Sequence, residues 1–213
     1  KQMKVAIFIC GALTLISGIS LLLISLEIDL TMLAMFLLGI AGIIAAIKYT
    51  VGKGAYGYKG MGDLFVFLFF GIVGVMGTVY LQTQELIVAD FIPASCFGLL
   101  SAGVLNLNNM RDHKNDADSD KNTLVVYMGY SNAKIYHLIL TLPPILLLGS
   151  YAFMNSPGYT NLLLLAPFVI LLVAYLRVAK TKDERKLDPE LKTLALTTFL
   201  SSVLFAVTLC VSF

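Results

Sequence analysis

The sequence predicts an all-α protein, a polytopic bundle of transmembrane helices, and three observations lead to that fold class. Apolar residues make up 58% of the 213 residues and charged residues only 13%, whereas a soluble domain carries about 25% charged residues. Long stretches without charge recur along the whole chain, and the basic residues fall into alternate connections between them. Because lipid offers backbone N–H and C=O groups no partner, stretches of this length must be helices.

Seven apolar stretches are the candidate membrane spans. A helix needs about 17–25 mainly apolar residues to cross about 30 Å of hydrocarbon. Six of the stretches carry no charge, and the last carries only Lys192, near its start. We therefore expect seven transmembrane helices, at residues 5–25, 30–47, 64–81, 91–107, 135–153, 161–176 and 191–213. In the third, Gly71, Gly74 and Gly77 are spaced as in closely packed helices.

The basic residues indicate how these helices are oriented. All 15 Lys and Arg residues precede the first span or lie between spans two and three, four and five, or six and seven, when Lys192 at the start of the last span is counted with the connection before it. The opposite connections carry Glu27, Asp29 and Glu85 but no basic residue. This asymmetry is the positive-inside pattern. We expect a multi-pass protein of the plasma (inner) membrane whose long polar connections face the cytoplasm.

Asn108, Asp112 and Asp116 are the strongest chemical signal in the chain. Their spacing of four residues places three polar oxygens on one face of a helix. Like charges at this spacing destabilise a bare helix, and a bound cation would remove that repulsion. Oxygen ligands without His or Cys suit Mg²⁺, which proteins usually hold with one or two carboxylates plus substrate phosphates. These three residues are the predicted metal ligands.

Basic residues alternate with these acids. Arg111, Lys114 and Lys121 lie within or just after the acidic segment, and a metal-bridged polyanion needs acids for the metal and bases for the remaining phosphate charge. A solvated acidic loop at the membrane surface is the alternative interpretation. His113 lies about 100° around the helix from Asp112, so we expect it to face away from the acids.

Two other connections at the same membrane face differ in character. Residues 49–63 contain five glycines and three tyrosines. The glycines free the backbone to approach a ligand, and Lys53 is the natural phosphate contact, although a flexible loop with interfacial tyrosines is the alternative. Residues 179–190 form a mixed-charge stretch with one proline, which we interpret as a solvated linker without chemistry.

Both of the first two segments resemble motifs of the UbiA superfamily of membrane prenyltransferases. Residues 108–112 (NNMRD), Asp116, residues 121–124 (KNTL) and Gly129 look like its second Asp-rich motif. Residues 49–53 and 57–71 are similar to its other cytoplasmic loop and the helix that follows. Within the superfamily, the pattern is most like the enzymes of menaquinone biosynthesis that prenylate 1,4-dihydroxy-2-naphthoate.

The resemblance implies a nine-helix fold with a central cavity open to the cytoplasm and a first Asp-rich motif at the end of the second helix. No Asn-x-x-x-Asp-x-x-x-Asp pattern precedes Asn108. Residues 1–213 are therefore expected to form one domain that is incomplete at its N-terminus, corresponding to helices three to nine and lacking half of the metal site. The superfamily usually has Gly where this chain has Asp120, which we expect to form a turn, with an additional carboxylate ligand as the alternative.

The activity implied by the resemblance is an Mg²⁺-dependent transfer of a polyprenyl group from polyprenyl diphosphate to 1,4-dihydroxy-2-naphthoate, giving demethylmenaquinone. The lipid bilayer is an expected partner and nucleic acid is not. The implied catalytic residues are Asp112, Asp116, Arg111 and Lys53. The implied substrate-binding residues are Tyr49, Lys53, Asn109, Arg111 and Lys121. The implied metal ligands are Asn108, Asp112 and Asp116.

Three alternatives remain at this point. A prenyltransferase of the same superfamily could use another aromatic acceptor. An ion or solute transporter is a second possibility, because acids within membrane spans often mark ion paths, but every Asp and Glu lies near the end of a span or outside one. An inactive fragment or scaffold is the third, motivated by the missing first motif.

Overall fold

A computed structural model describes residues 2–52, 54–155 and 158–211. Helices account for nearly all of these residues, and no strand occurs among them. The order of elements is α1 (Gln2–Ser25), α2 (Leu30–Thr50), η1 (Tyr56–Tyr58), α3 (Gly62–Val66), η2 (Phe67–Met76), α4 (Gly77–Thr83), η3 (Val88–Asp90), α5 (Phe91–Asp118), α6 (Leu124–Asn155), η4 (Tyr159–Leu164), α7 (Leu165–Lys180), η5 (Glu184–Leu187) and α8 (Asp188–Val211).

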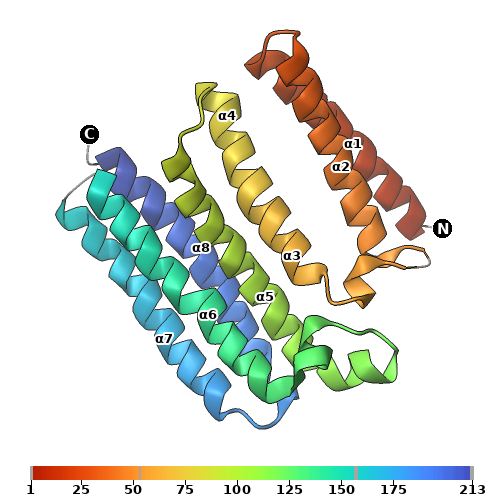
Figure 1. The fold of residues 1–213 in the computed structure, drawn as a ribbon, viewed down its shortest axis with the longest axis vertical. Helices are drawn as coiled ribbons and strands as arrows, with labels where there is room; N and C mark the ends of the chain where they lie inside the picture. The colour runs from red at the N-terminus through yellow and green to blue at the C-terminus, as the bar shows by residue number, and fades with distance from the viewer. Residues whose placement is uncertain (1, 53, 156–157, 212–213) are drawn as a thin grey trace.

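The predicted all-α fold class and the seven spans are confirmed. Within the described ranges, seven helical segments are long and apolar enough to cross a membrane. The third span is one rod made of α3, η2 and α4 (Figure 1), with η2 as a π-helical stretch at its centre. The protein is a multi-pass membrane protein.

The helices extend beyond the predicted spans at the end of the molecule that carries the basic connections. Helix α5 continues eleven residues past position 107, to Asp118, and helical residues precede position 135 from Leu124 onward, with a break at Gly129, where φ is 78°. The α2, α5 and α7 C-termini gather at this same end (Figure 1). The acidic motif is therefore helical and projects from the bundle.

Helix α5 is the central element of the bundle. It packs against η2, α6 and α8, and Leu100, Leu107 and Met110 are fully buried in the main hydrophobic core. Its contact with η2 is a backbone contact, because a Cβ built on Gly71 would lie 2.5 Å from the Gly98 Cα atom. Small residues allow such close approach, so the expectation of close packing is confirmed at Gly71.

Helices α1 and α2 form a pair at one edge of the molecule (Figure 1). Among their described residues only Leu22 and Ala45 are buried. The Asp29 carboxylate caps α2 by accepting a hydrogen bond of 2.9 Å from the Met32 N–H, and this bond lowers the pKa of that carboxyl. The apolar side chains of this pair face outward, as lipid-facing helices require.

Two glycines of the same rod should respond differently to alanine. Gly71→Ala should lower the free energy of unfolding by about 1–3 kcal/mol, because its methyl group overlaps α5. Gly77→Ala should be neutral or stabilising by up to about 1 kcal/mol, because nothing lies within 4 Å of its Cβ position and alanine favours helix. Unfolding of the full-length protein in detergent measures both. Equal effects would contradict the described packing.

Candidate active site

The α5 segment that projects from the bundle carries the predicted metal ligands on one face. Asn108 and Asp112 are partly exposed, whereas Asp116 is 5% exposed. The helix ends after Asp118, and Asp120 adopts the left-handed conformation with φ 53°. The Lys121 N–H then donates to the Asp116 carbonyl oxygen at 2.8 Å, which turns the chain back over the acids. The expectation that Asp120 forms a turn is confirmed.

Arg111 lies at the centre of the exposed half of this site. Its Nε and Nη2 atoms donate to the two carboxylate oxygens of Asp112, both at 2.8 Å. Nη2 also donates to Asn108 Oδ1 at 2.9 Å, and Nη1 donates to Asp188 Oδ1 at 2.8 Å. The planar guanidinium suits such paired bonds to carboxylate or phosphate oxygens. Arg111 thus engages the same oxygens that were predicted to hold metal.

Lys121 pairs with Asp116, in the buried half of the site, as Arg111 pairs with Asp112 in the exposed half. Its Nζ atom lies 3.1 Å from each carboxylate oxygen of Asp116. Asn109, on the same helix, is 3% exposed, and its Oδ1 atom has no hydrogen-bond partner among the described residues. The site therefore combines two paired acids with a buried amide oxygen that is free to accept a hydrogen bond.

The donor chemistry of this face fits Mg²⁺ only if other oxygens complete the coordination. Asn108, Asp112 and Asp116 offer an amide and two carboxylates, which are the ligand types that Mg²⁺ prefers. In the part of the chain that the structure describes, no group of three or more His, Cys, Asp or Glu residues is placed to hold a metal. Mg²⁺ that is coordinated partly by phosphate oxygens needs only one or two protein carboxylates, which is the number this face offers.

The glycine-rich segment folds over the same end of the molecule. The Asn122 N–H donates to the Tyr58 carbonyl oxygen at 3.1 Å, which joins this segment to the turn after α5. A Cβ on Gly57 would lie 2.6 Å from the Tyr49 carbonyl oxygen, so glycine lets the segment close against α2. Tyr56 donates to the Ala45 carbonyl oxygen at 2.9 Å, and burial raises the pKa of its phenol.

A cleft of about 370 Å³ lies where the two segments meet. Its lining residues are Thr50, Gly52, Gly54, Ala55, Tyr58, Lys59, Asp120 and Asn122. The prediction that these segments share one face is confirmed, and Tyr49 is half-buried beside them. Lys53, the predicted phosphate contact, lies outside the described residues.

The interpretation of residues 179–190 as a linker without chemistry needs correction. Glu184 is buried, and its Oε1 atom lies 2.6 Å from Lys114 Nζ. Asp188 binds Arg111, as described above. Both acids border a cleft of about 340 Å³ that also includes Asp112. Sequence reasoning missed them because their distance along the chain from α5 hides the contact.

His113 packs against α6 rather than against Asp112 or Asp116, as predicted, and His137 is buried. The His113 ring stacks on Tyr130 of α6, with centroids 5.2 Å apart, and its Nδ1 atom lies 3.2 Å from the Met110 carbonyl oxygen. His137 is buried within α6, and its Nδ1 atom has no partner among the described residues.

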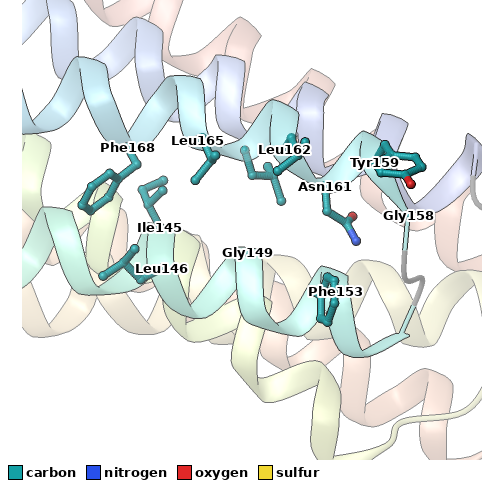
Figure 2. Close-up of a pocket in the computed structure, with 11 residues that line it drawn as sticks. Ile145, Leu146, Gly149, Phe153, Gly158, Tyr159, Asn161, Leu162, Leu165 and Phe168 are labelled. Atoms are coloured by element: carbon teal, nitrogen blue, oxygen red, sulfur yellow. The ribbon is translucent and has the colours of Figure 1, made fainter.

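An apolar cavity of about 650 Å³ lies between α6, η4 and α7 (Figure 2). Phe153, Leu162 and Phe168 are among its lining residues. It borders the end of α6 remote from Leu124, so it is separate from the charged site. Its lining has no ionisable group apart from the Tyr159 phenol.

The family model described as "UbiA prenyltransferase family" matches residues 2–203. The chain belongs to the UbiA prenyltransferase family. A family member in Haemophilus influenzae named 1,4-dihydroxy-2-naphthoate octaprenyltransferase is 36% identical over 211 residues, which cover 99% of this chain and 68% of that protein. The Escherichia coli protein of the same name is 37% identical over 207 residues, 96% of this chain and 67% of its own length.

A more distant UbiA relative is human "UbiA prenyltransferase domain-containing protein 1". It is 30% identical over 103 residues, which cover 48% of this chain and 30% of the human protein. No solved structure matches the chain significantly. The UbiA family members are prenyltransferases, so the charged end of α5 and the glycine-rich segment next to it are the candidate active site.

The turn after α5 supplies a prediction at Asp120. Asp120→Val should lower the free energy of unfolding by about 1–2 kcal/mol, because a β-branched residue fits the left-handed conformation poorly. Asp120→Gly should stay within about 1 kcal/mol of the natural protein, because glycine adopts this conformation readily. Thermal unfolding in detergent measures both. An equal loss of stability in both variants would show that the carboxylate, rather than the turn, is what position 120 requires.

Proposed function

We propose that the protein transfers a polyprenyl group from polyprenyl diphosphate to 1,4-dihydroxy-2-naphthoate, with release of diphosphate and carbon dioxide, giving the reduced (quinol) form of demethylmenaquinone. The observation that carries this proposal is the alternation of acids and bases on α5 beside the glycine-rich segment. The names of the two bacterial relatives support the acceptor. The UbiA family supports the prenyl donor.

The diphosphate is the ligand that this charge pattern suits. Arg111 and Lys121 are each bound to a carboxylate in the structure, and a diphosphate offers oxygens of the same kind for the same donors. Lys53 and Tyr49 are proposed to contact it from the neighbouring segment, and the Asn109 amide from α5. These bases stabilise the charge that develops on the leaving group as the allylic C–O bond breaks.

Asn108, Asp112 and Asp116 are proposed to hold Mg²⁺ together with diphosphate oxygens. When held by these residues, Mg²⁺ would neutralise negative charge on the leaving diphosphate. When diphosphate draws Arg111 and Lys121 toward itself, the acid oxygens that these bases now engage become available as ligands. Acids and bases thus exchange internal partners for substrate partners, so that no charge is left unpaired.

The location follows from the charge asymmetry. We place the basic end of the molecule in the cytoplasm and the chain in the plasma (inner) membrane, because all 15 basic residues lie in alternate connections. The diphosphate would then enter from the cytoplasm, while the polyprenyl chain stays among apolar helices or in lipid. Residues 1–213 would act as part of a single UbiA-type domain.

The proposed reaction is tested with the full-length protein in lipid nanodiscs. Polyprenyl diphosphate, Mg²⁺ and 1,4-dihydroxy-2-naphthoate should give prenylated product and carbon dioxide, and chelation of the metal should stop the reaction. 4-Hydroxybenzoate serves as a competing acceptor. Prenylation of 4-hydroxybenzoate without prenylation of the naphthoate would refute the proposed acceptor, and absence of transfer to either would refute the enzyme.

The two α5 carboxylates should be needed for turnover. Asp112→Ala and Asp116→Ala should each lower kcat by about 100-fold or more, because the metal that stabilises the leaving group loses a ligand. Asp118→Ala is the matched control, since this exposed acid ends the same helix and should keep full activity. Membrane insertion should be normal in all three. Near-normal turnover in either test variant would remove that residue from the site.

Arg111 should act mainly on the diphosphate. Arg111→Lys should raise the KM for polyprenyl diphosphate about 10-fold, because lysine cannot reproduce the fork of paired bonds. The KM for the naphthoate should not change. Lys186→Ala is the control, a basic residue whose side chain is 77% exposed. An unchanged donor KM with a raised acceptor KM would place Arg111 in the acceptor half instead.

A further inference from the structure

The Asp63 carboxylate differs from the other buried acids of the molecule. Asp116 pairs with Lys121, Glu184 with Lys114, and Glu190 with Arg177. Asp63 is only 5% exposed, yet among the described residues no basic side chain pairs with it. Its Oδ1 atom is buried without a hydrogen-bond partner. Burial of an unpaired carboxylate is costly, so this residue indicates a ligand that the fold itself does not provide.

One phenol lies beside this carboxylate. A Cβ on the neighbouring Gly62 would lie 3.4 Å from Cε2 of Tyr49 and 3.6 Å from its hydroxyl oxygen. An aromatic ring next to a hydrogen-bond acceptor suits a flat ring that carries a hydroxyl group.

Helix α5 connects the surroundings of Asp63 with the charged site. The same Cβ position on Gly62 lies 3.2 Å from Leu105 Cδ2 of α5. Asn109 and Asp116 follow Leu105 by four and eleven residues, which keeps all three on one face of the helix. Asp63 therefore lies beside the proposed diphosphate site and on the same internal face.

We propose that Asp63 is the acceptor-side catalytic residue, whose carboxylate accepts a hydrogen bond from the ring hydroxyl next to the attacked carbon of the aromatic acceptor. This inference rests on the proposed prenyl transfer. Tyr49 packs against the ring and holds it beside Asp63. The buried position of the carboxylate strengthens the bond, because no water competes for the hydroxyl proton.

The electrons and the proton balance in this step. The allylic C–O bond breaks, and its electron pair leaves with diphosphate. A ring π pair forms the new C–C bond at the carbon that bears the carboxylate, which makes the neighbouring hydroxyl strongly acidic, and Asp63 accepts its proton or shares it. The bond to the carboxylate then breaks, carbon dioxide leaves, its electron pair restores the ring, and the proton returns to the ring oxygen.

This role makes the interaction strongest in the transition state. In the free acceptor, the hydroxyl can bond the acceptor's own adjacent carboxylate. That internal bond is lost when the attacked carbon becomes tetrahedral and the carboxylate leaves the ring plane. Asp63 then takes over the proton when its acidity is greatest. Interactions that strengthen on the way to the transition state raise kcat.

The test compares Asp63→Asn with the natural full-length enzyme in nanodiscs on two acceptors. One is 1,4-dihydroxy-2-naphthoate, and the other is its 1-methoxy analogue, whose oxygen next to the attacked carbon cannot donate. Asp63→Asn should lower kcat with the dihydroxy acceptor by about 100-fold or more. With the methoxy analogue, the slow rates of the two proteins should agree within about 3-fold, since there is no proton for Asp63 to accept. Polyprenyl diphosphate affinity should be unchanged, and Asp118→Asn should match the natural enzyme.

Several outcomes would overturn the inference. Turnover of Asp63→Asn within about 3-fold of the natural enzyme, or an equal loss with both acceptors, rules out a role at the acceptor hydroxyl. Asp63→Glu keeps the carboxylate and should retain part of the rate with the dihydroxy acceptor only. If the Asn variant does not fold, this comparison of the two acceptors tests the role of the carboxylate. If the natural enzyme prenylates 4-hydroxybenzoate instead, the proposed acceptor is wrong, and 4-hydroxybenzoate with 4-methoxybenzoate tests Asp63 in the same way.

Discussion

The inability of lipid to solvate polar groups is the constraint on which the rest of this structure depends. Every backbone hydrogen bond within the membrane has to be made inside a helix, and the charged side chains are confined to the helix ends. Since the basic residues all lie in alternate connections, one end of the bundle collects almost all of the chemistry. The opposite end has short turns and an apolar cavity.

The same constraint explains how acids are accommodated at the basic end. A carboxylate withdrawn from water needs a partner of opposite charge or several hydrogen-bond donors. Asp116 and Glu184 meet this requirement with lysines from the same or neighbouring segments. Paired in this way, the acids and bases neutralise one another, and in the proposed reaction a diphosphate with its metal would replace both sets of partners.

Helix α5 connects this chemistry to the core. Its first half is held by a backbone contact between Gly98 and Gly71 and by fully buried Leu100 and Leu107. Its last three turns continue out of the apolar region as one helix. The acids therefore lie on a helix that is fixed in place by its packing in the core. A rigid element of this kind positions ligands more precisely than a loop does.

The sequence by itself determined the helical class, the seven spans and the acidic face of α5, because composition and spacing act locally and lipid permits few alternatives. It also indicated the turn at Asp120 and that His113 faces away from Asp112. Only the tertiary structure decided that Arg111 joins Asp112 to Asp188, that Glu184 lies against Lys114, and that the buried Asp63 Oδ1 atom has no hydrogen-bond partner among the described residues. These facts depend on which segments, distant in the sequence, come into contact when the helices pack. No local pattern of residues specifies those contacts.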